Sequence, residues 1–126
     1  MDSQEPRDET CIFCRIFTKE EPATIIYAFE KDSFLVIVPL EPVTTGHLLV
    51  IPRVHVPNFK VDPVLSGETM ACASIYARRL GGDFNVITSS GPASTQTIQH
   101  LHVHLIPRVE GDGLVLPWTH QQNKEA

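Results

Sequence analysis

The sequence predicts an α+β domain, with an antiparallel sheet of about five strands, a short N-terminal helix and one longer helix. Two observations favour this class. Runs with strand character outnumber runs with helical character, and hairpin connections dominate over helical crossovers. We expect the helices to pack on one side of the sheet.

The first elements are expected to be a short helix and a hairpin. Thr10 is a residue type that caps helices, so the helix is expected over 11–17. β-Branched and aromatic residues predict strands over 24–29 and 34–38. The polar residues 31–33 between them predict the turn of a hairpin.

The middle of the chain is expected to contain one strand and the longer helix. After a Pro-rich loop over 39–46, an apolar run predicts a strand over 47–51. The helix is expected over 63–80, because Gly81-Gly82 stops it. Four apolar residues recur at helical spacing and are expected to be core: Met70, Ala73, Ala77 and Leu80.

The last two strands are expected over 83–88 and 97–107, with a turn over 89–95 between them. The final strand has a histidine at every second position, with aliphatic residues in the gaps: His100, His102 and His104 alternate with Leu101, Val103 and Leu105. A period of two places the three imidazoles on one face. A polar outer face is the simpler alternative, but histidine titrates near neutral pH and binds metals, so the pattern favours chemistry.

Composition fits one ordinary globular domain of 126 residues, 42% apolar and 20% charged. We expect a flexible leader over 1–10, a folded domain over 11–117 and a polar tail over 118–126. The net charge of −5 argues against a broad nucleic-acid surface. No apolar run approaches a membrane span and the polar N-terminus does not resemble a secretory signal, so a cytoplasmic protein is expected.

The three cysteines have different expected roles. Cys72 lies in the longer helix and is expected to be a small buried apolar residue. Cys11 and Cys14 form a C-x-x-C pair, which a reducing cytosol would not keep as a structural disulfide. Zinc binding and redox chemistry both remain open for this pair, although the βαβ pattern expected around a redox motif is missing.

Three segments resemble the histidine triad (HIT) superfamily. Residues 96–105, Gln-Thr-Ile-Gln-His-Leu-His-Val-His-Leu, resemble its signature, and residues 46–55 resemble its Gly-His-x-Leu-Val-Ile-Pro-x-x-His segment. Residues 11–14, Cys-Ile-Phe-Cys, resemble the opening of its zinc-containing members. Because the three motifs occur in the family's order, the chain is identified as a member, with a HIT-like fold.

The resemblance implies a nucleotide hydrolase or nucleotidyltransferase that acts through a covalent intermediate on the middle histidine, His102. A neutral imidazole is a usable nucleophile towards phosphorus. In this family the backbone carbonyl of the first histidine, here His100, orients the nucleophile's ring. His47 and His104 are implied to flank the α-phosphate and to stabilise its charge in the transition state.

The implied substrate is a purine nucleotide. Gln96 and Thr97 would add polar contacts to the phosphate and the leaving group. Five apolar residues match positions that hold the purine in relatives: Ile12, Phe13, Ile16, Ile37 and Leu49. Plain core packing is the alternative for each of them.

The resemblance also assembles a structural zinc site from residues far apart in the sequence: Cys11, Cys14, His55 and His100. Two thiolates and two imidazoles suit four-coordinate Zn²⁺, and a site with no open position favours stability rather than chemistry. Free cysteines and a surface His55 are the alternative. The family resemblance further suggests a homodimer.

The chain departs from the family pattern at three positions. Relatives usually carry Asp or Asn where this chain has Pro39, and that residue binds the ribose hydroxyls. Proline offers no donor from its side chain or its backbone. Relatives usually carry Asn or Gln at the position of Ser89, which stays a candidate substrate contact, and Gly at the position of Thr95.

Three functions follow as hypotheses. The leading one is an enzyme that cleaves a nucleoside phosphoanhydride, phosphoramidate or related ester. The second is a non-catalytic nucleotide sensor on the same fold, which the altered ribose position favours and the complete triad disfavours. The third is a redox or metal-handling protein built on Cys11 and Cys14.

Overall fold

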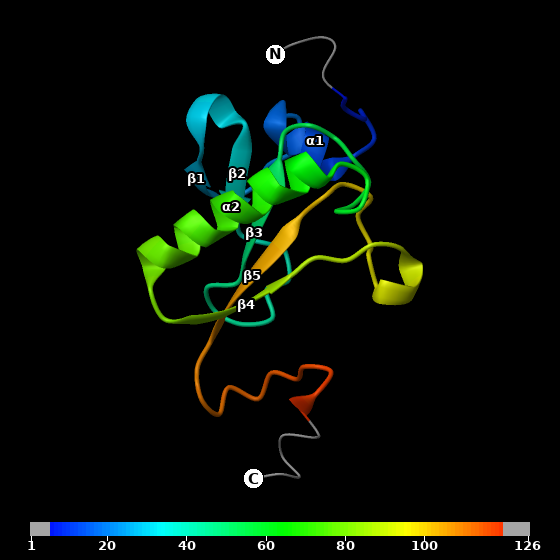
Figure 1. Ribbon diagram of the computed structural model, residues 1–126. Coiled ribbons are helices and arrows are strands. Elements are labelled where there is room, and N and C mark those ends of the chain that lie inside the picture. Colours follow the sequence, from blue (N-terminus) through cyan, green and yellow to red (C-terminus); the bar gives the residue numbers. More distant parts are fainter. Residues whose placement is uncertain (1–5, 120–126) are drawn as a thin grey trace.

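The structure, a computed structural model, describes residues 6–119. Five strands pair antiparallel in the order β1-β2-β3-β5-β4, which confirms the predicted α+β class and the hairpin (Figure 1). The helices are α1 (Ile12–Phe17) and α2 (Pro63–Leu80). The strands, in chain order, are β1 (Ile25–Ala28), β2 (Phe34–Ile37), β3 (Leu48–Pro52), β4 (Asp83–Ile87) and β5 (Val103–Arg108).

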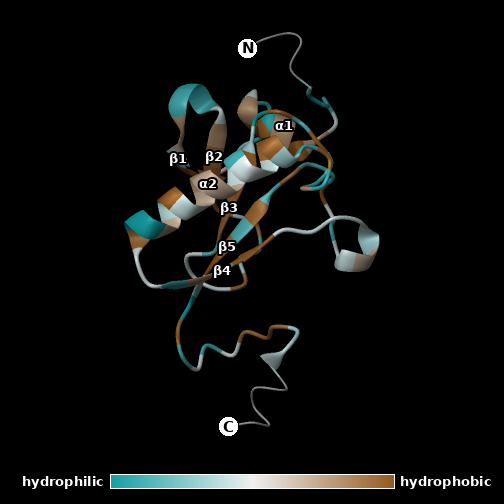
Figure 2. Cartoon of the chain, in the orientation of Figure 1, coloured by the Kyte–Doolittle hydropathy of each residue, from teal (hydrophilic) through white to brown (hydrophobic). Residues whose placement is uncertain are grey.

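The central strand β3 is buried on both faces, and Figure 2 shows it as apolar in colour. Leu49 and Ile51 pack in one core with α1, whereas Leu48 and Val50 pack in a second core with α2. Successive strand residues point to opposite faces, so the two helices cover opposite sides of the sheet. The expectation that both helices lie on one side is therefore wrong, because β3 has no polar face to expose.

The sequence suggested Thr10 as the N-cap of helix α1, but the N-cap in the structure is Cys11. The Cys11 Sγ accepts a hydrogen bond from the Cys14 amide at 3.5 Å. The amide and hydroxyl of Thr10 both donate to the Asp8 carboxylate, at 2.8 and 2.6 Å. Because its amide and its hydroxyl both bind Asp8, Thr10 does not cap the helix, and the next residue, Cys11, is the N-cap.

Helix α2 has the predicted bounds, with Asp62 accepting a hydrogen bond from the Leu65 amide as its N-cap. Its buried face is the predicted one only in part: Ala73 is fully buried and Ala77 packs against the core, but Met70 and Leu80 are 43% and 50% exposed. The buried residues are Leu65, Thr69, Cys72, Ala73 and Tyr76, which confirms the prediction for Cys72. Thr69 can be fully buried because its hydroxyl donates to the Leu65 carbonyl at 2.8 Å.

The histidine strand is shorter than expected. β5 begins at Val103, so His100 and His102 precede it in irregular backbone. The Leu101 amide donates to the Val56 carbonyl at 2.8 Å instead of joining the sheet. The predicted alternation still holds, because the aliphatic residues of this segment are almost fully buried: Leu101, Val103 and Leu105.

The structure describes only part of the expected leader and tail, residues 6–10 and 118–119. Residues 1–5 and 120–126, which belong to the expected leader and tail, lie outside the described residues. Within the expected leader, the Pro6 carbonyl accepts a hydrogen bond from the His55 amide at 2.8 Å, and the Asp8 amide donates to Cys14 Sγ. Neither helix in the described part of the chain has the length and apolarity that a membrane crossing requires.

Candidate functional site

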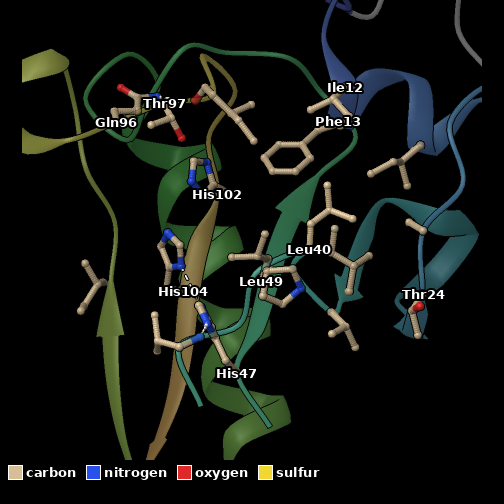
Figure 3. A pocket seen from close by; sticks show the side chains of 18 of the residues that line it. Ile12, Phe13, Thr24, Leu40, His47, Leu49, Gln96, Thr97, His102 and His104 are labelled. Carbon is tan, nitrogen blue, oxygen red and sulfur yellow. Dashed lines mark hydrogen bonds between the residues drawn. The ribbon is translucent and has the colours of Figure 1, made fainter. Parts of the chain in front are cut away.

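A pocket of about 910 Å³ opens on the α1 side of the sheet (Figure 3). The lining includes every residue that the sequence assigned to substrate contact or to the phosphate group: Ile12, Phe13, Ile16, Ile37, His47, Leu49, Ser89, Gln96, Thr97, His102 and His104. His100 is absent from this lining. The structure therefore brings together residues from α1, three strands and the loop before β5.

The strand register explains part of this gathering. His104 on β5 is paired with Leu49 on β3 and with Ile87 on β4, so the three side chains share one face. Ile37 on β2 pairs with Leu49 and extends the same row. The alternation of the strands thus places apolar side chains beside the histidines.

Sequence reasoning missed about half of the lining. The missed residues come from the segment before β1, the loop after β2, the last two strands and the loop between these strands: Glu21, Pro22, Ala23, Thr24, Val38, Leu40, Val43, Ile87, Thr95, Ile98 and Ile106. Ile87 and Ile106 could have been found from the pairing of the last two strands. The loop residues carry no periodic signal, because their position follows from the path of the chain.

The ring of His102 has a fixed orientation. Its Nδ1 lies 2.8 Å from the His100 carbonyl oxygen, which can only accept. Nδ1 therefore carries the proton, and Nε2 of the neutral ring keeps a free lone pair. The Phe13 ring meets the His102 ring edge-on, with centroids 5.2 Å apart. This arrangement presents an unprotonated nitrogen in a residue that lines the pocket.

His47 and His104 form a second ordered pair. The Val43 amide donates to His47 Nδ1 at 3.0 Å, so the proton of neutral His47 lies on Nε2. That nitrogen lies 3.0 Å from His104 Nδ1 and donates to it. The proton of neutral His104 is consequently on its Nε2, which is a donor without a partner among the hydrogen bonds of the described residues. The pair thus offers one N–H group at a defined place.

Burial keeps these imidazoles neutral. Desolvation lowers the pKa of His47 and His102 below the ordinary value. Desolvation, followed by the charges of His102 and His47, lowers the pKa of His104 to about 4. Among the lining residues of the described chain, Glu21 is the one formally charged side chain and no Lys or Arg occurs. A bound anion would therefore meet neutral donors here.

Gln96 and Thr97 are placed differently. The Gln96 amide group donates to the carbonyls of Pro57 and Ile98, at 2.6 and 2.9 Å, and accepts from the Gly91 amide at 2.9 Å. These bonds hold the loop before β5, so Gln96 would have to exchange one of them to touch a substrate. Thr97 is exposed and is free to contact a ligand at the pocket.

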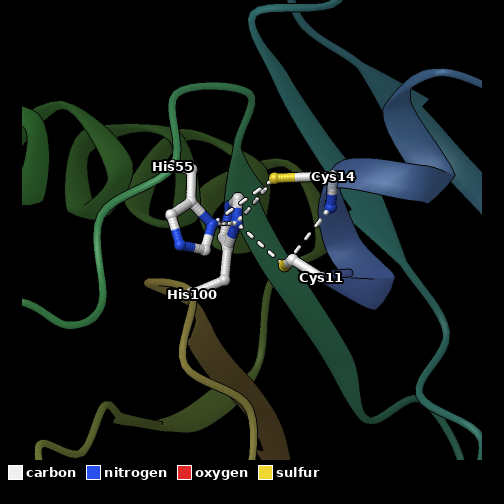
Figure 4. A group of neighbouring side chains, drawn as sticks. All are labelled: Cys11, Cys14, His55 and His100. Atoms are coloured by element: carbon white, nitrogen blue, oxygen red, sulfur yellow. Dashed lines mark hydrogen bonds between the residues drawn. The ribbon is translucent and has the colours of Figure 1, made fainter. Parts of the chain in front are cut away.

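A second cluster lies beside the pocket (Figure 4). One ligand atom from each of Cys11, Cys14, His55 and His100 lies within 4.8 Å of the others. The structure thus joins the four residues that the sequence proposed, although they come from α1, the segment after β3 and the loop before β5. The cluster could hold a metal ion.

The chemistry of the four donors fits a tetrahedral cation. The sulfur-to-nitrogen distances are 3.4–3.6 Å, close to the ~3.5 Å expected around tetrahedral zinc from its bond lengths. His100 Nε2 donates to the Pro52 carbonyl at 2.8 Å, so the lone pair on its Nδ1 faces the cluster. His55 Nδ1 faces that lone pair at 3.0 Å. Two nitrogens in this relation need a proton or a cation between them.

Burial acts on the protons of this cluster. Desolvation raises the pKa of the Cys14 thiol to about 11 and lowers the pKa of His100 to about 4. The thiol would thus keep its proton in the protein alone, whereas a bound cation stabilises the thiolate. Metal binding at this cluster should therefore release protons and weaken as the pH falls.

The HIT domain family model matches residues 18–111 of the chain. The adenosine 5′-monophosphoramidase of Saccharomyces cerevisiae is 33% identical over 122 residues, which cover 91% of this chain and 73% of the yeast protein. An adenylylsulfatase of Arabidopsis thaliana is 34% identical over 110 residues. That match covers 82% of this chain and 55% of the plant protein, so the chain spans about half of its length.

A solved structure gives the same result in three dimensions. A zinc-bound histidine triad family protein from Mycobacterium smegmatis is 36% identical and superimposes with a TM-score of 0.71. The match covers 85% of this chain and 81% of the mycobacterial one. The likeness therefore extends over most of the chain rather than over one motif.

We expect His104 to remain neutral well below pH 6, because burial lowers its pKa to about 4. In the unfolded chain a histidine titrates near 6.5, so between about pH 6.5 and 4 the unfolded state binds more protons. The free energy of unfolding should therefore fall as the pH is lowered through this window. NMR titration of the ring Cε1–H signals measures the midpoint, and His104→Gln assigns the signal. A midpoint near 6.5 in the folded protein would contradict the prediction.

Proposed function

The chain belongs to the HIT family, and we propose that it is a nucleotide hydrolase or nucleotidyltransferase that acts through a covalent nucleotidyl-His102 intermediate. The supporting observation is the geometry of His102. Its Nδ1 donates to the His100 carbonyl at 2.8 Å, which leaves Nε2 free as a nucleophile in the pocket lining. The names of the yeast and plant relatives, a phosphoramidase and an adenylylsulfatase, support a phosphoramidate or a mixed anhydride of a nucleotide as substrate.

The proposed reaction has two displacements at phosphorus. In the first, His102 Nε2 forms a bond to the α-phosphorus, and the bond to the leaving group breaks with its electron pair. In the second, water or another acceptor attacks the same phosphorus, and the bond to Nε2 breaks with its electron pair returning to His102. The proton that the attacking group loses to solvent balances the one that the leaving group takes up. The Nε2–H of His104, held by its bond from His47, would stabilise the charge that develops on the phosphoryl oxygens.

The nucleoside would lie in the apolar part of the pocket. We propose that a purine packs against residues of α1, β2 and β3: Ile12, Phe13, Ile16, Ile37 and Leu49. Thr97 would contact the phosphate or the leaving group, and Ser89 is a candidate for a sugar contact. Gln96 would serve mainly by holding the loop that carries Thr97.

We propose that the cluster of Cys11, Cys14, His55 and His100 binds one Zn²⁺ with a structural role. The four residues would bind zinc as a cation and so hold α1 against the segment after β3 and the loop before β5. Four protein ligands fill a tetrahedral site, so no position is open to a substrate. The zinc-bound mycobacterial relative supports the choice of metal.

We further propose a cytoplasmic homodimer that binds neither nucleic acid nor membranes. The net charge of −5 disfavours a nucleic-acid surface. An apolar hollow on the α2 side, with Phe59, Met70 and Val86 in its lining, offers a surface for a second copy.

A nucleotide sensor without turnover is the second candidate function. It is favoured by Pro39, which lines the pocket and offers no hydrogen-bond donor to the ribose.

We predict that His102→Ala abolishes turnover, with a loss of about 10³-fold or more, because no other group can form the phosphorus–nitrogen bond. Binding of adenosine monophosphate should largely survive, since the rest of the pocket is unchanged. Steady-state kinetics and calorimetry measure the two effects. Gln99→Ala is the matched control, because Gln99 is exposed and does not line the pocket. Rapid-quench trapping of a nucleotidyl adduct separates the enzyme from the sensor, and wild-type rates in His102→Ala would refute the nucleophile.

We predict about one zinc per chain in the purified protein. Cys14→Ser should lower metal content and melting temperature together, because metal binding to the native site is linked to folding. Cys72→Ser is the control, since this buried thiol lies in the core under α2 and should affect stability without affecting metal. Metal analysis and calorimetry measure both quantities. Zinc-free protein with unchanged stability would leave the cluster without this role.

We predict weak discrimination between ribose and 2′-deoxyribose, less than about tenfold in kcat/KM, or about 1.4 kcal/mol. A site that hydrogen-bonds a hydroxyl rejects the analogue without it, because its own polar groups lose their partner, and Pro39 has no such group. Pro39→Asp should raise the preference for ribose. Pro42→Asp is the control, on the same loop but outside the pocket lining. A hundredfold preference in the unmodified protein would show that another group, such as Ser89, binds the ribose.

A further inference from the structure

Thr88 contacts the proposed nucleophile through the backbone. Its Oγ1 donates a hydrogen bond to the His102 carbonyl at 2.7 Å. The pairing between β4 and β5 ends at Ile87 and His104, so both residues of this bond lie beyond the paired part of the sheet. The hydroxyl therefore supplies a link between the two segments where the backbone ladder has stopped.

Thr88 lies away from the proposed substrate. It is not part of the lining of the substrate pocket, and it lines the apolar hollow on the α2 side together with Leu101 and Val103. The side chains of Leu101 and Val103 point to that side, whereas His102 points to the pocket. The hydrogen bond to the His102 carbonyl is the contact through which the Thr88 side chain reaches the proposed nucleophile.

The segment 100–102 needs such contacts because it is not part of a strand. Three hydrogen bonds tie its residues to three other segments: His100 Nε2 to the Pro52 carbonyl, the Leu101 amide to the Val56 carbonyl, and the His102 carbonyl to the Thr88 hydroxyl. The His102 ring takes its direction from the carbonyl of His100 inside the same segment. A shift at residue 102 would therefore redirect Nε2, and a displacement of about 1 Å can reduce a rate by about 10²-fold.

We infer that Thr88 is a positioning residue for His102, which holds the backbone of the nucleophile from the face of the sheet opposite the substrate. The inference rests on the proposed function for its effect on rate, but the contact with His102 is tested independently. Thr88→Val removes the hydroxyl and keeps the shape of the side chain. Thr88→Ser keeps the hydroxyl and removes one methyl group.

The kinetic test uses adenosine 5′-monophosphoramidate with the zinc-loaded full chain. Thr88→Val should lower kcat by about 10- to 100-fold and leave KM within about twofold, because the binding groups of the pocket are untouched. Thr88→Ser should keep kcat within about twofold of the unmodified protein. Thr69→Val is the matched control, since it also removes a Thr hydroxyl that donates to a backbone carbonyl, but within α2. It should leave kcat unchanged.

The spectroscopic test follows the His102 Nδ1–H proton and the ring nitrogen shifts by NMR. The signals should report a proton fixed on Nδ1 in three proteins: the unmodified protein, the Thr88→Ser variant and the Thr69→Val variant. In Thr88→Val the Nδ1–H signal should move upfield or broaden as the bond to His100 loosens. This measurement needs no substrate, so it decides the role of Thr88 even if the protein turns over no nucleotide and the proposed function fails.

Two results would overturn the inference. One is an unchanged kcat together with an unchanged His102 signal in Thr88→Val. The other is a kcat in Thr88→Ser that falls by tenfold or more, because the hydroxyl would then not be the group that matters. If Thr88→Val does not fold, Thr88→Ala, which also removes the hydroxyl, takes its place in both measurements, and an unchanged kcat with an unchanged His102 signal in that variant overturns the inference.

Discussion

The buried imidazole of His100 connects the two sites of the protein. The side chain is fully buried, its Nε2 donates to the Pro52 carbonyl, and its Nδ1 faces Cys11, Cys14 and His55. The backbone carbonyl of the same residue fixes the proton of His102. One residue thus belongs to the metal-type cluster through its ring and to the proposed reaction through its backbone. A change in the cluster that moves His100 would therefore also change the orientation of the His102 ring, although the substrate does not contact the cluster.

Backbone groups determine which nitrogen of each imidazole is free. His100 and His102 each donate to a carbonyl oxygen, whereas His47 accepts from the Val43 amide. Because every ring is also desolvated, the neutral forms persist at pH 7 and present one lone pair or one proton each. Donors fixed in this way need no reorganisation when charge develops on a phosphoryl group, which is the usual source of electrostatic catalysis. A pocket without Lys or Arg in its described lining can therefore still suit a phosphate.

The sequence was informative where local patterns determine the structure. The period-two alternation correctly predicted that Leu101, Val103 and Leu105 are buried, and the spacing before Gly81-Gly82 predicted the bounds of α2. The predicted buried face of α2 was right for Ala73 but missed Thr69, which is buried because its hydroxyl is satisfied within the helix, and no apolar pattern reveals this. Other features depend on partners that local patterns do not reveal. Cys11 is the cap because Asp8 binds Thr10, whereas Gln96 and Thr88 bind carbonyls of residues distant in the sequence. The gathering of the cluster and the pocket was likewise beyond spacing arguments, and the motifs supplied it by resemblance.

Helix α1 shows why the cluster and the pocket occur together. It has six residues, and an isolated helix of this length does not form stably in water. Its N-terminus lies in the cluster, through Cys11 as cap and Cys14 in the first turn, while Phe13 and Ile16 line the pocket. Phe13 also packs edge-on against both His100 and His102. A cation held by the two cysteines would fix the direction of this single short helix, and with it the wall that faces the nucleophile. Stability at the cluster and shape at the pocket are therefore two consequences of the same local constraint.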